Sequence, residues 1–479
     1  MKISAEQIEL IAQRVTERLG QKPASAARAS DSAGRDSLTD GVFADIDSAA
    51  AAAWVAQKQL IGLSMAKRQE IIANIRQVLR EHTEDLARAA LNETGLGRLE
   101  DKIIKNQLVI EKTPGTEDLT PRAGSGDRGL MLVEPAPYGV IGAITPITNP
   151  TSTIICNSIG MVAAGNSVVF NVHPGASKVS VFNVQLLNRA IVGAGGPSNV
   201  VTTVADPTIE SAQELMAHPR IRLLVVTGGE GVVKVAMRSG KRAICAGPGN
   251  PPVVVDETAD LDQAGRDIVQ GASFDNNIVC VLEKEIIAVD QIADDLKKSL
   301  VHHNCVEVKD YQLRQLEKVI FQETHGPGKP GVMNKEYIGK CADVILRQIG
   351  VNVGKEIRMA IVEVDRDHPL FLTEQMMPVM PLVRVRNADE GIDLAVRAEQ
   401  GFGHTAMMHS KNIDNLSRMA REINCSIFVK NGPSVAGLGY GGEGYTSFSI
   451  ASPTGEGLTS ARSFTRDRRC VLVDHFRIV

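Results

Sequence analysis

The stretch "YGVIGAITPITNPTSTIICNSIGMVAAGNSVVFNV", residues 138–172, decides the fold. It holds two short runs rich in β-formers, 138–145 and 166–172, on either side of a helical stretch of small residues. Both runs are rich in apolar residues without strict alternation, which is typical of strands that are buried on both faces. The pattern therefore predicts an α/β fold with a parallel sheet.

The same rhythm continues beyond this stretch. Further apolar runs follow at 199–205, 221–228 and 250–256. A helix, a strand and a helix then repeat over residues 258–303, which predicts a second α/β domain. Upstream, residues 43–60 and 67–95 read as two helices, and Gly95 is expected to end the second. The tail, 468–479, reads as a strand that completes another sheet, in this chain or in a neighbouring subunit.

The N-terminus carries a different kind of segment. Residues 3–19 read as a short amphipathic helix, in which Ser4 and Gln7 have the form of a capping box and Gly20 can end the helix. Residues 21–40 are rich in Ala, Ser, Gly, Asp and Arg, and therefore read as a flexible linker. A helix on such a tether is typical of a docking peptide. The alternative is a helix that packs on its own subunit.

Composition excludes several classes of protein. The 479 residues suggest two to four domains, and the net charge of −4 argues against a nucleic-acid partner. No apolar run approaches the ~18 residues of a membrane span, so no membrane partner is expected. The seven cysteines include no C-x-x-C pair, which favours reduced thiols in a cytoplasmic protein over a disulfide framework.

Cys280 is a candidate nucleophile. It follows small and amide residues in "GASFDNNIVCVLEK", 271–284, which leave room for a substrate. A thiol is partly ionised near neutrality and needs less activation than other nucleophiles. From this local sequence alone, a buried core cysteine is the more common interpretation.

Two further segments could hold a ligand. Asn149 follows the strand that ends at Thr145–Pro146, and it could donate to an oxyanion or could cap the helix that begins at Pro150. Gly228 and Gly229 follow another strand and precede a helix, where backbone amides suit a phosphate or pyrophosphate. The G-x-G-x-x-G at 437–442 has no helical pattern after it, so a loop with tight turns is predicted there instead of a dinucleotide site.

Other clusters favour structural interpretations. His302, His303 and Cys305 lie at the end of a predicted helix without a second pair at metal-site spacing, so no metal site is predicted. Four arginines near the C-terminus read as a solvated or intersubunit face that could touch phosphates: Arg462, Arg466, Arg468 and Arg469.

Taken together, these segments resemble the aldehyde dehydrogenase superfamily across roughly residues 41–479. The motifs occur in the family's order: T-P-x-x-N at 145–149, A-A-G-N at 163–166, T-G-G at 227–229, A-G-x-G-N-P-P at 246–252, the cysteine at 280, E-x-x-x-P at 374–378 and F-V-K-N-G-P-S at 428–434. Segments such as "NETGLGRLEDK", "GASFDNN" and "SIFVKNGPS" look like the CoA-acylating aldehyde dehydrogenases of bacterial microcompartments, the ethanolamine- and propanediol-utilisation enzymes.

The resemblance implies a Rossmann-type cofactor domain, a second α/β catalytic domain and a β oligomerisation arm. It places the cofactor domain at 41–247 with a hairpin near 117–137, the catalytic domain at 248–430, and a return to the cofactor domain with an oligomerisation strand at 431–479.

The resemblance also assigns roles to residues. Cys280 would be the nucleophile, and Asn149 with the Cys280 backbone N–H would form the oxyanion hole. Glu374 would hold the nicotinamide ribose of NAD, and His404 in "GHTAMMHS" would line the site or help to deprotonate coenzyme A. The other cofactor-binding positions implied are Thr145, Pro146, Pro174, Gly228 and Gly229.

Two departures from the family pattern matter. Hydrolytic members carry a glutamate 34 residues before the cysteine, whereas Ala246 stands there in this chain. That glutamate is the general base for water, so a thioacyl-enzyme on Cys280 is expected to survive until the coenzyme A thiol arrives. Asn171 stands where members that bind the adenosine ribose use a lysine, which leaves the adenosine contacts open.

The resulting hypothesis is an NAD-dependent oxidation of a short aldehyde to acyl-CoA. Acetaldehyde is preferred over propionaldehyde because "FDNNIVC" and the C-terminal "FRIV" look more like the ethanolamine branch. Residues 1–20 resemble encapsulation peptides, which implies a shell-protein partner and location in a microcompartment lumen. A homo-oligomer, dimer or tetramer, is expected separately, in keeping with the oligomerisation arm that the family resemblance implies. The alternatives are a semialdehyde dehydrogenase that reduces an acyl phosphate, a cysteine hydrolase and a non-catalytic shell adaptor.

Overall fold

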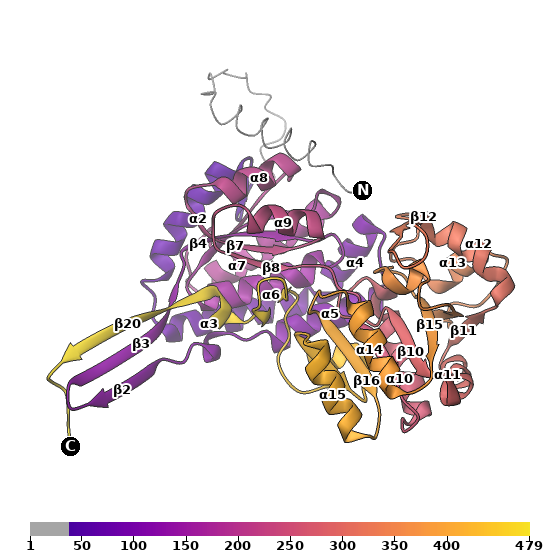
Figure 1. Ribbon diagram of the computed structural model, residues 1–479. Coiled ribbons are helices and arrows are strands. Elements are labelled where there is room, and N and C mark those ends of the chain that lie inside the picture. The colour runs from indigo at the N-terminus through magenta and orange to yellow at the C-terminus, as the bar shows by residue number, and fades with distance from the viewer. Residues whose placement is uncertain (1–37) are drawn as a thin grey trace, which may run out of the picture. The chain divides into compact units, whose positions relative to one another are not determined.

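The computed structural model describes residues 38–479, and within them two parallel sheets carry the fold (Figure 1). The predicted N-terminal helix 3–19 and the linker up to residue 37 lie outside the described residues. No described helix combines the length and the apolar character that crossing a bilayer requires.

The first sheet has six strands in the order β1-β6-β5-β4-β7-β8, all of them parallel. Its strands are β1 (Val42–Phe43), β4 (Val140–Thr145), β5 (Ser167–Val172), β6 (Val201–Val204), β7 (Ile221–Thr227) and β8 (Ala243–Ala246). Every residue of β4 and β5 is buried, which confirms the expectation from their apolar runs. The chain leaves β4 towards β5 and β6 and then returns to its other side for β7, so the strand order reverses at β4.

Helices cover both faces of this sheet (Figure 1). The helices that pack on its strands are α2 (Ile46–Leu60), α6 (Pro150–Ala163), α7 (Ser177–Gly193), α8 (Ile209–Ala217) and α9 (Glu230–Met237). An outer layer packs on α6 and α7 and consists of α3 (Met65–Glu81), α4 (Thr83–Thr94) and α5 (Leu99–Lys112). The prediction of one helix over 67–95 is wrong, because the backbone leaves the helical conformation at His82 and α4 begins there. "TED" after His82 supplies acidic residues that suit the first turn of a new helix. Gly95 ends α4 in a left-handed conformation, φ 66°, as expected.

The second sheet has seven parallel strands in the order β11-β14-β15-β10-β9-β16-β17. Its strands are β9 (Pro252–Val255), β10 (Glu285–Val289), β11 (Cys305–Val308), β14 (Met359–Glu363), β15 (Val379–Val385), β16 (Thr405–His409) and β17 (Ile427–Lys430). The helices around it are α10 (Leu261–Ser273), α11 (Asp290–His302), α12 (Asp310–Ile320), α13 (Ala342–Arg347), α14 (Ala388–Glu399) and α15 (Ile413–Ile423). The predicted domain boundary at 247/248 falls in the short link between β8 and β9.

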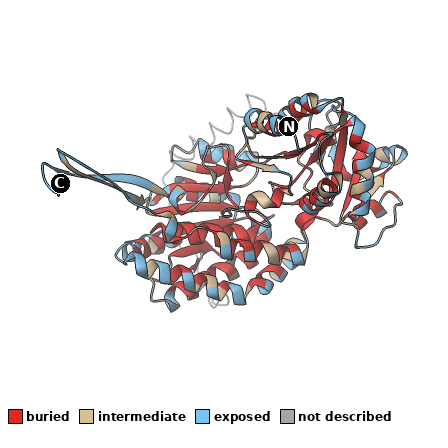
Figure 2. Cartoon of the chain, turned by 90° about the horizontal axis from the view of Figure 1, so that it is seen from below, coloured by how far each residue is buried: buried red, intermediate tan, exposed pale blue. Residues whose placement is uncertain are grey.

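A third sheet forms an arm on the first one (Figure 1). It joins β2 (Arg122–Gly126), β3 (Gly129–Pro137) and β20 (Thr465–Val473), and β20 runs antiparallel to β3. The C-terminal strand therefore completes a sheet of its own chain. Strands β2 and β20 are exposed almost throughout, in contrast to the buried strands of the two large sheets (Figure 2).

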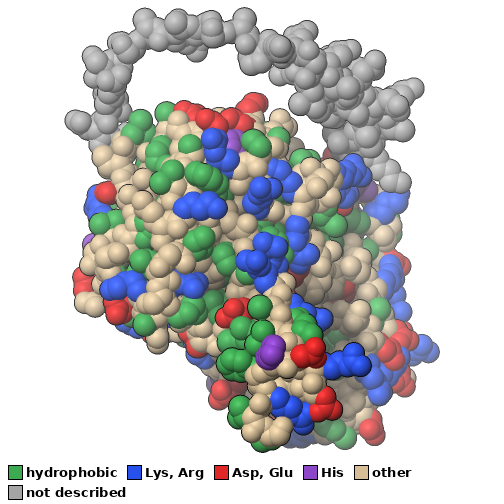
Figure 3. All heavy atoms as spheres, turned by 90° about the vertical axis from the view of Figure 1, so that its left-hand side faces the viewer, with side chains coloured by type: hydrophobic (Ala, Val, Ile, Leu, Met, Phe, Trp, Pro, Cys, Tyr) green, Lys and Arg blue, Asp and Glu red, His purple; other side chains and the backbone are tan. Residues whose placement is uncertain are grey.

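Basic side chains gather on the face from which the arm extends (Figure 3). A hollow of about 880 Å³ lies there, lined in part by Trp54, Tyr138, Arg222, Arg466 and Arg468. Two of the four arginines singled out in the tail thus border this hollow, not the cavity described next.

Candidate active site

A cavity of about 610 Å³ lies at the carboxyl ends of β4, β5 and β7. In open α/β sheets ligands bind at this edge, where the strand order reverses. Eight of the nine site residues expected from the sequence line it: Thr145, Pro146, Asn149, Pro174, Gly228, Gly229, Cys280 and Glu374. The loops that lead into β9, β10 and β15 of the second sheet form the opposite wall.

The cavity wall fits a dinucleotide. Gly229 is the N-cap of α9, so the first amides of that helix are available to a pyrophosphate at the end of β7. The hydroxyl of Thr145 is buried in the wall, and no partner for it exists among residues 38–479. Asn171 also lines the cavity, but its amide oxygen accepts from Ser211 Oγ at 2.5 Å, so the start of α8 already engages it.

The G-x-G-x-x-G at 437–442 does not line this cavity. It begins within the 3₁₀ turn η6 (Ser434–Leu438), and Gly439 and Gly441 adopt left-handed conformations in the loop after that turn. The prediction of a loop with tight turns is confirmed.

Cys280 stands at the end of an unusual backbone segment. Asp275, Asn276 and Asn277 all have positive φ, at 44°, 54° and 67°. Such conformations cost energy for residues other than glycine and cluster at functional sites. The fully buried Lys284 holds the following turn, donating to the carbonyl oxygens of Asn277 at 2.8 Å and of Val279 at 3.4 Å.

The thiol of Cys280 is neutral in this environment. Burial, together with the negative charge of Glu374, raises its pKa to about 12, and the nearby Lys284 only partly opposes the shift. The cavity without ligands therefore opposes the partial ionisation that a free thiol has near neutral pH. A cationic ligand beside the thiol would lower this pKa.

Asn149 occupies the N-cap position of α6, but its side chain does not cap the helix. Its amide oxygen instead accepts from Lys105 Nζ at 2.7 Å, and its NH₂ group donates to Thr148 Oγ1 at 3.1 Å. Both Asn149 and Thr148 line the cavity. The sequence left open whether Asn149 caps the helix or donates to an oxyanion. The geometry favours the oxyanion donor.

His404 lies outside the cavity wall. Its side chain is fully buried, its Nδ1 pairs with Thr405 Oγ1 at 2.9 Å, and burial lowers its pKa to about 4. A Cβ on Gly249 would lie 2.8 Å from the imidazole, so the histidine packs directly behind the loop that carries Gly247 and Pro248 of the cavity wall. A role for His404 in deprotonating a thiol stays a prediction, and it would require this loop to move.

Ala246, the position of the missing base, ends β8 beside the cavity. It is 3% exposed, pairs with Thr227 of β7 and precedes Gly247 in the wall. A longer acidic side chain at this position would therefore start from the edge of the cavity.

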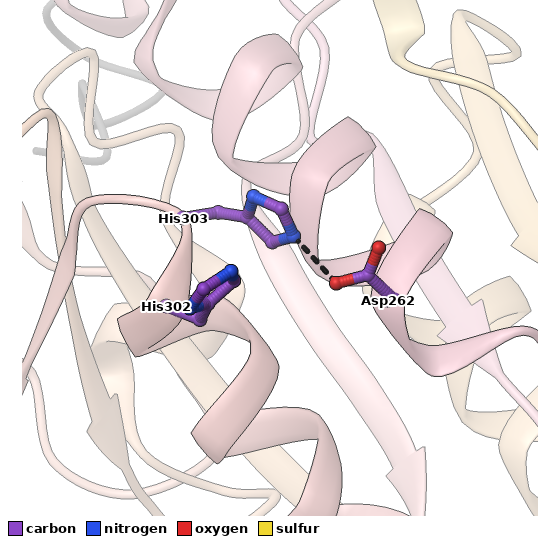
Figure 4. Close-up of side chains that lie close together, drawn as sticks. All are labelled: Asp262, His302 and His303. Carbon is purple, nitrogen blue, oxygen red and sulfur yellow. Dashed lines mark hydrogen bonds and ion pairs between the residues drawn. The ribbon is translucent and has the colours of Figure 1, made fainter.

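The two histidines near the end of α11 meet Asp262 on the surface (Figure 4). His303 Nε2 pairs with Asp262 Oδ1 at 2.9 Å, while Asp262 and His302 are exposed. Cys305, which looked like a third ligand in the sequence, is buried in β11 and is not part of this group. The hydrogen bond between Asp262 and His303 accounts for this histidine without a metal, and the absence of a metal site stays a prediction.

Three buried charged residues around the site escaped the sequence analysis: Lys105, Asp275 and Lys284. One signal was available for Lys105. It shares a helix face with Lys102, Leu108 and Val109 at helical spacing, and a lysine on an apolar face needs a buried partner.

Known proteins share this fold and much of the sequence. The model of the aldehyde dehydrogenase family matches residues 36–457. The chain is 53% identical over 440 residues to the acetaldehyde dehydrogenase (acetylating) EutE of Escherichia coli (strain K12), covering 92% of this chain and 94% of that one. It is 52% identical, with a TM-score of 0.88, to a Rhodopseudomonas palustris propionaldehyde dehydrogenase solved with bound CoA and an acylated cysteine, over 91% of this chain and 99% of that one. For the propionaldehyde dehydrogenase of the Clostridium phytofermentans fucose utilisation bacterial microcompartment, the identity is 49% and the TM-score 0.89, over 92% and 100% of the two chains.

Proposed function

Since this chain belongs to the aldehyde dehydrogenase family, we propose that it oxidises a short aldehyde to acyl-CoA with NAD as the hydride acceptor. The proposal rests on one cavity that is lined by Cys280, Asn149 and the glycines after β7 that would bind a dinucleotide. Ala246, beside this cavity, stands where hydrolytic members of the family have their base. Acetaldehyde and propionaldehyde are the substrates. The 53% identity to an acetylating acetaldehyde dehydrogenase favours acetaldehyde.

The residues act in sequence on the aldehyde. As the Cys280 sulfur bonds to the carbonyl carbon, its proton passes to solvent water, and the carbonyl π pair moves onto oxygen, where the Asn149 NH₂ group and the Cys280 N–H would donate to it. NAD⁺ would be held by Thr145, Gly229 and Glu374 and would supply the hydride acceptor. When the adduct carbon gives up its hydride, the oxygen pair re-forms the C=O bond and a thioester remains on Cys280. The sulfur of coenzyme A then attacks this thioester, and Cys280 departs as the thiolate.

The alanine determines which nucleophile ends the cycle. Water is a poor nucleophile and needs a positioned base, whereas a thiol needs much less assistance. Glu374 is the one carboxylate in the cavity wall among the described residues, and the proposed nicotinamide ribose contact would occupy it. The thioester on Cys280 therefore persists until coenzyme A enters.

The decisive assay follows NADH formation from two- to four-carbon aldehydes with and without coenzyme A. NADH formation that depends on coenzyme A, together with acyl-CoA as product, supports the proposal. Activity that is indifferent to coenzyme A contradicts it, and a requirement for phosphate in its place would indicate a semialdehyde dehydrogenase that acts through an acyl phosphate.

Ala246→Glu is expected to raise the release of free acid from the acyl-enzyme without coenzyme A, because it restores a carboxylate at the edge of the cavity. The measurement is free acetate per NADH formed from acetaldehyde. Ala246→Gln, which has the same shape but cannot act as a base, is the control. An equal rise in both variants would mean that water entry, not base catalysis, limits hydrolysis.

The chain is proposed to act as a homo-oligomer through its arm. The three-stranded sheet exposes apolar side chains of β20, among them Val471, Leu472 and Val473, and its strands β2 and β20 are exposed almost throughout. A small sheet without a covering layer gains stability when another surface packs on it. A second copy of the chain is the partner proposed here.

Residues 1–20 are proposed to bind a microcompartment shell protein and so to bring the enzyme into the shell lumen. Their predicted amphipathic pattern and their tether support this proposal, as does the microcompartment relative. Deletion of residues 1–20 is expected to abolish encapsulation while the activity of the purified enzyme stays within about twofold, since the cavity lies wholly within the described residues. Co-fractionation with shells and the NADH assay measure the two effects. Loss of activity in solution would support the packed-helix alternative.

A further inference from the structure

Lys105 lies directly behind the amide of Asn149. It extends from α5, is 2% exposed and donates to the amide oxygen of Asn149 at 2.7 Å. An ammonium group has only donors, so the amide oxygen must face Lys105 and the NH₂ group must point elsewhere. That NH₂ group bonds to Thr148, a residue of the cavity wall. The donor end of the amide is therefore held on the cavity side.

Lys105 also places positive charge behind that amide. Its Nζ pairs with Asp275 Oδ2, which Lys102 Nζ also contacts, at 3.2 Å. The other Asp275 oxygen accepts the backbone N–H of Arg98 at 2.7 Å. Because two ammonium groups share one carboxylate, the buried group carries an excess of one positive charge next to Asn149.

This charge is expensive to bury. Burial lowers the pKa of Lys105 to about 8, while the carboxylate of Asp275 favours the ammonium form. The neighbouring Asp101 forms its own pair with Arg358 at 2.8 Å and leaves the excess charge uncancelled. Buried, perturbed charges beside a cavity are candidates for a functional role, because an apolar residue would be cheaper for stability alone.

The same lysine reaches the backbone that carries the nucleophile. Asp275 is the first residue of the left-handed segment 275–277 that leads to Cys280. A Cβ on Gly97 would lie 1.9 Å from the Asp275 carboxylate, so the neighbouring chain fits closely around that side chain. Lys105 thus contacts both supports of the proposed oxyanion hole, the amide of Asn149 and the loop before Cys280.

The geometry points to Lys105 as a positioning residue, which aims the Asn149 donor at the oxyanion and polarises that amide with an uncompensated positive charge. In the addition step the carbonyl π pair moves onto oxygen, and the new negative charge lies in front of an amide whose far end is bound to an ammonium. Preorganised charge of this kind acts on the transition state and little on the bound aldehyde. The inference rests on the proposed function, because it needs the oxyanion of the cysteine adduct.

The test is Lys105→Met, which keeps the length of the side chain and removes its charge and donor. With aldehyde, NAD and coenzyme A, kcat is expected to fall about 10- to 100-fold while KM for the aldehyde changes little, since loss of a full oxyanion donor costs about 10²- to 10³-fold. Alkylation of Cys280 by iodoacetamide forms no oxyanion, so its rate is expected to stay within about threefold. In the Asn149→Ala background, Lys105→Met is expected to cost less than about twofold more, because the two residues act as a unit.

Lys102→Met is the matched control. Lys102 lies on the same helix and contacts the same Asp275, but only Lys105 donates to Asn149. Lys102→Met therefore removes the excess charge and keeps the donor behind the amide, so its loss in kcat is expected to be smaller than that of Lys105→Met. If Lys105→Met does not fold, Lys105→Gln, which removes the charge but keeps an N–H donor, serves in its place. A wild-type kcat in Lys105→Met, or in the variant that replaces it, would overturn the inference. It would also be overturned if Lys105→Met lowered kcat by the same factor in the Asn149→Ala background as in the wild type. A wild-type enzyme that is inactive with coenzyme A would instead overturn the proposed function.

Discussion

Cys280→Ala is expected to abolish aldehyde oxidation, with a loss of roughly 10⁴-fold or more, as for nucleophiles that act together with their supporting groups. All seven cysteines lie within the described residues, and Cys280 alone among them lines the cavity. Without the thiol no covalent adduct forms, so neither hydride transfer nor acyl transfer can follow. The measurements are the NADH assay and mass spectrometry of enzyme incubated with acetaldehyde and NAD, which should show an acyl group on the wild type only.

Cys470→Ala is the control for this variant, because Cys470 is exposed on β20 and belongs to the arm. Its NADH formation is expected to match the wild type. Full activity in Cys280→Ala would mean that another residue is the nucleophile. An acyl adduct on the mutant protein would identify that residue directly.

Asn149→Ala is expected to lower kcat by about 10²- to 10³-fold, the usual cost of one oxyanion donor. Its NH₂ group faces the cavity wall while Lys105 holds its oxygen, so the substitution removes a donor without opening the site to bulk solvent. KM for the aldehyde should change little, because the ground-state carbonyl carries less charge than the adduct. Steady-state kinetics with saturating NAD and coenzyme A separate the two parameters.

Thr148→Val controls for disturbance of the cavity wall. It removes the acceptor of the Asn149 NH₂ group but keeps that donor, so a loss of less than about tenfold is expected. A large rise in KM with unchanged kcat in Asn149→Ala would show that the amide binds the substrate and does not stabilise the oxyanion.

The parallel sheets could be predicted from the sequence because strands buried on both faces leave continuous apolar runs. Strands β4, β5 and β7 appear in this way. The break between α3 and α4 could not be predicted, since the apolar stripe continues through His82 without a glycine or proline. Strand β8 was missed because its four residues follow a charged stretch and lack a flanking pattern.

The site residues also differ in whether the sequence alone could reveal them. Cys280, Asn149 and Glu374 could be proposed from motif order, but only the topology brings the end of β4 next to the loop before β10. Lys105 and Lys284 were missed because lysines are mostly exposed, and their partners are distant carboxylates and backbone carbonyls that no local pattern reveals. The raised pKa of Cys280 could not be predicted for a related reason. The pKa depends on how far the folded chain removes the thiol from water, and the neighbouring residues in the sequence do not determine this.

The protonated thiol of Cys280 has a consequence for how long the enzyme lasts. Its raised pKa keeps the thiolate scarce at neutral pH while the cavity is empty. Peroxides and stray electrophiles attack the thiolate and largely spare the thiol. An enzyme that works among reactive aldehydes thus keeps its nucleophile in the less reactive thiol form between turnovers. The thiol becomes reactive when ligands bind in the cavity.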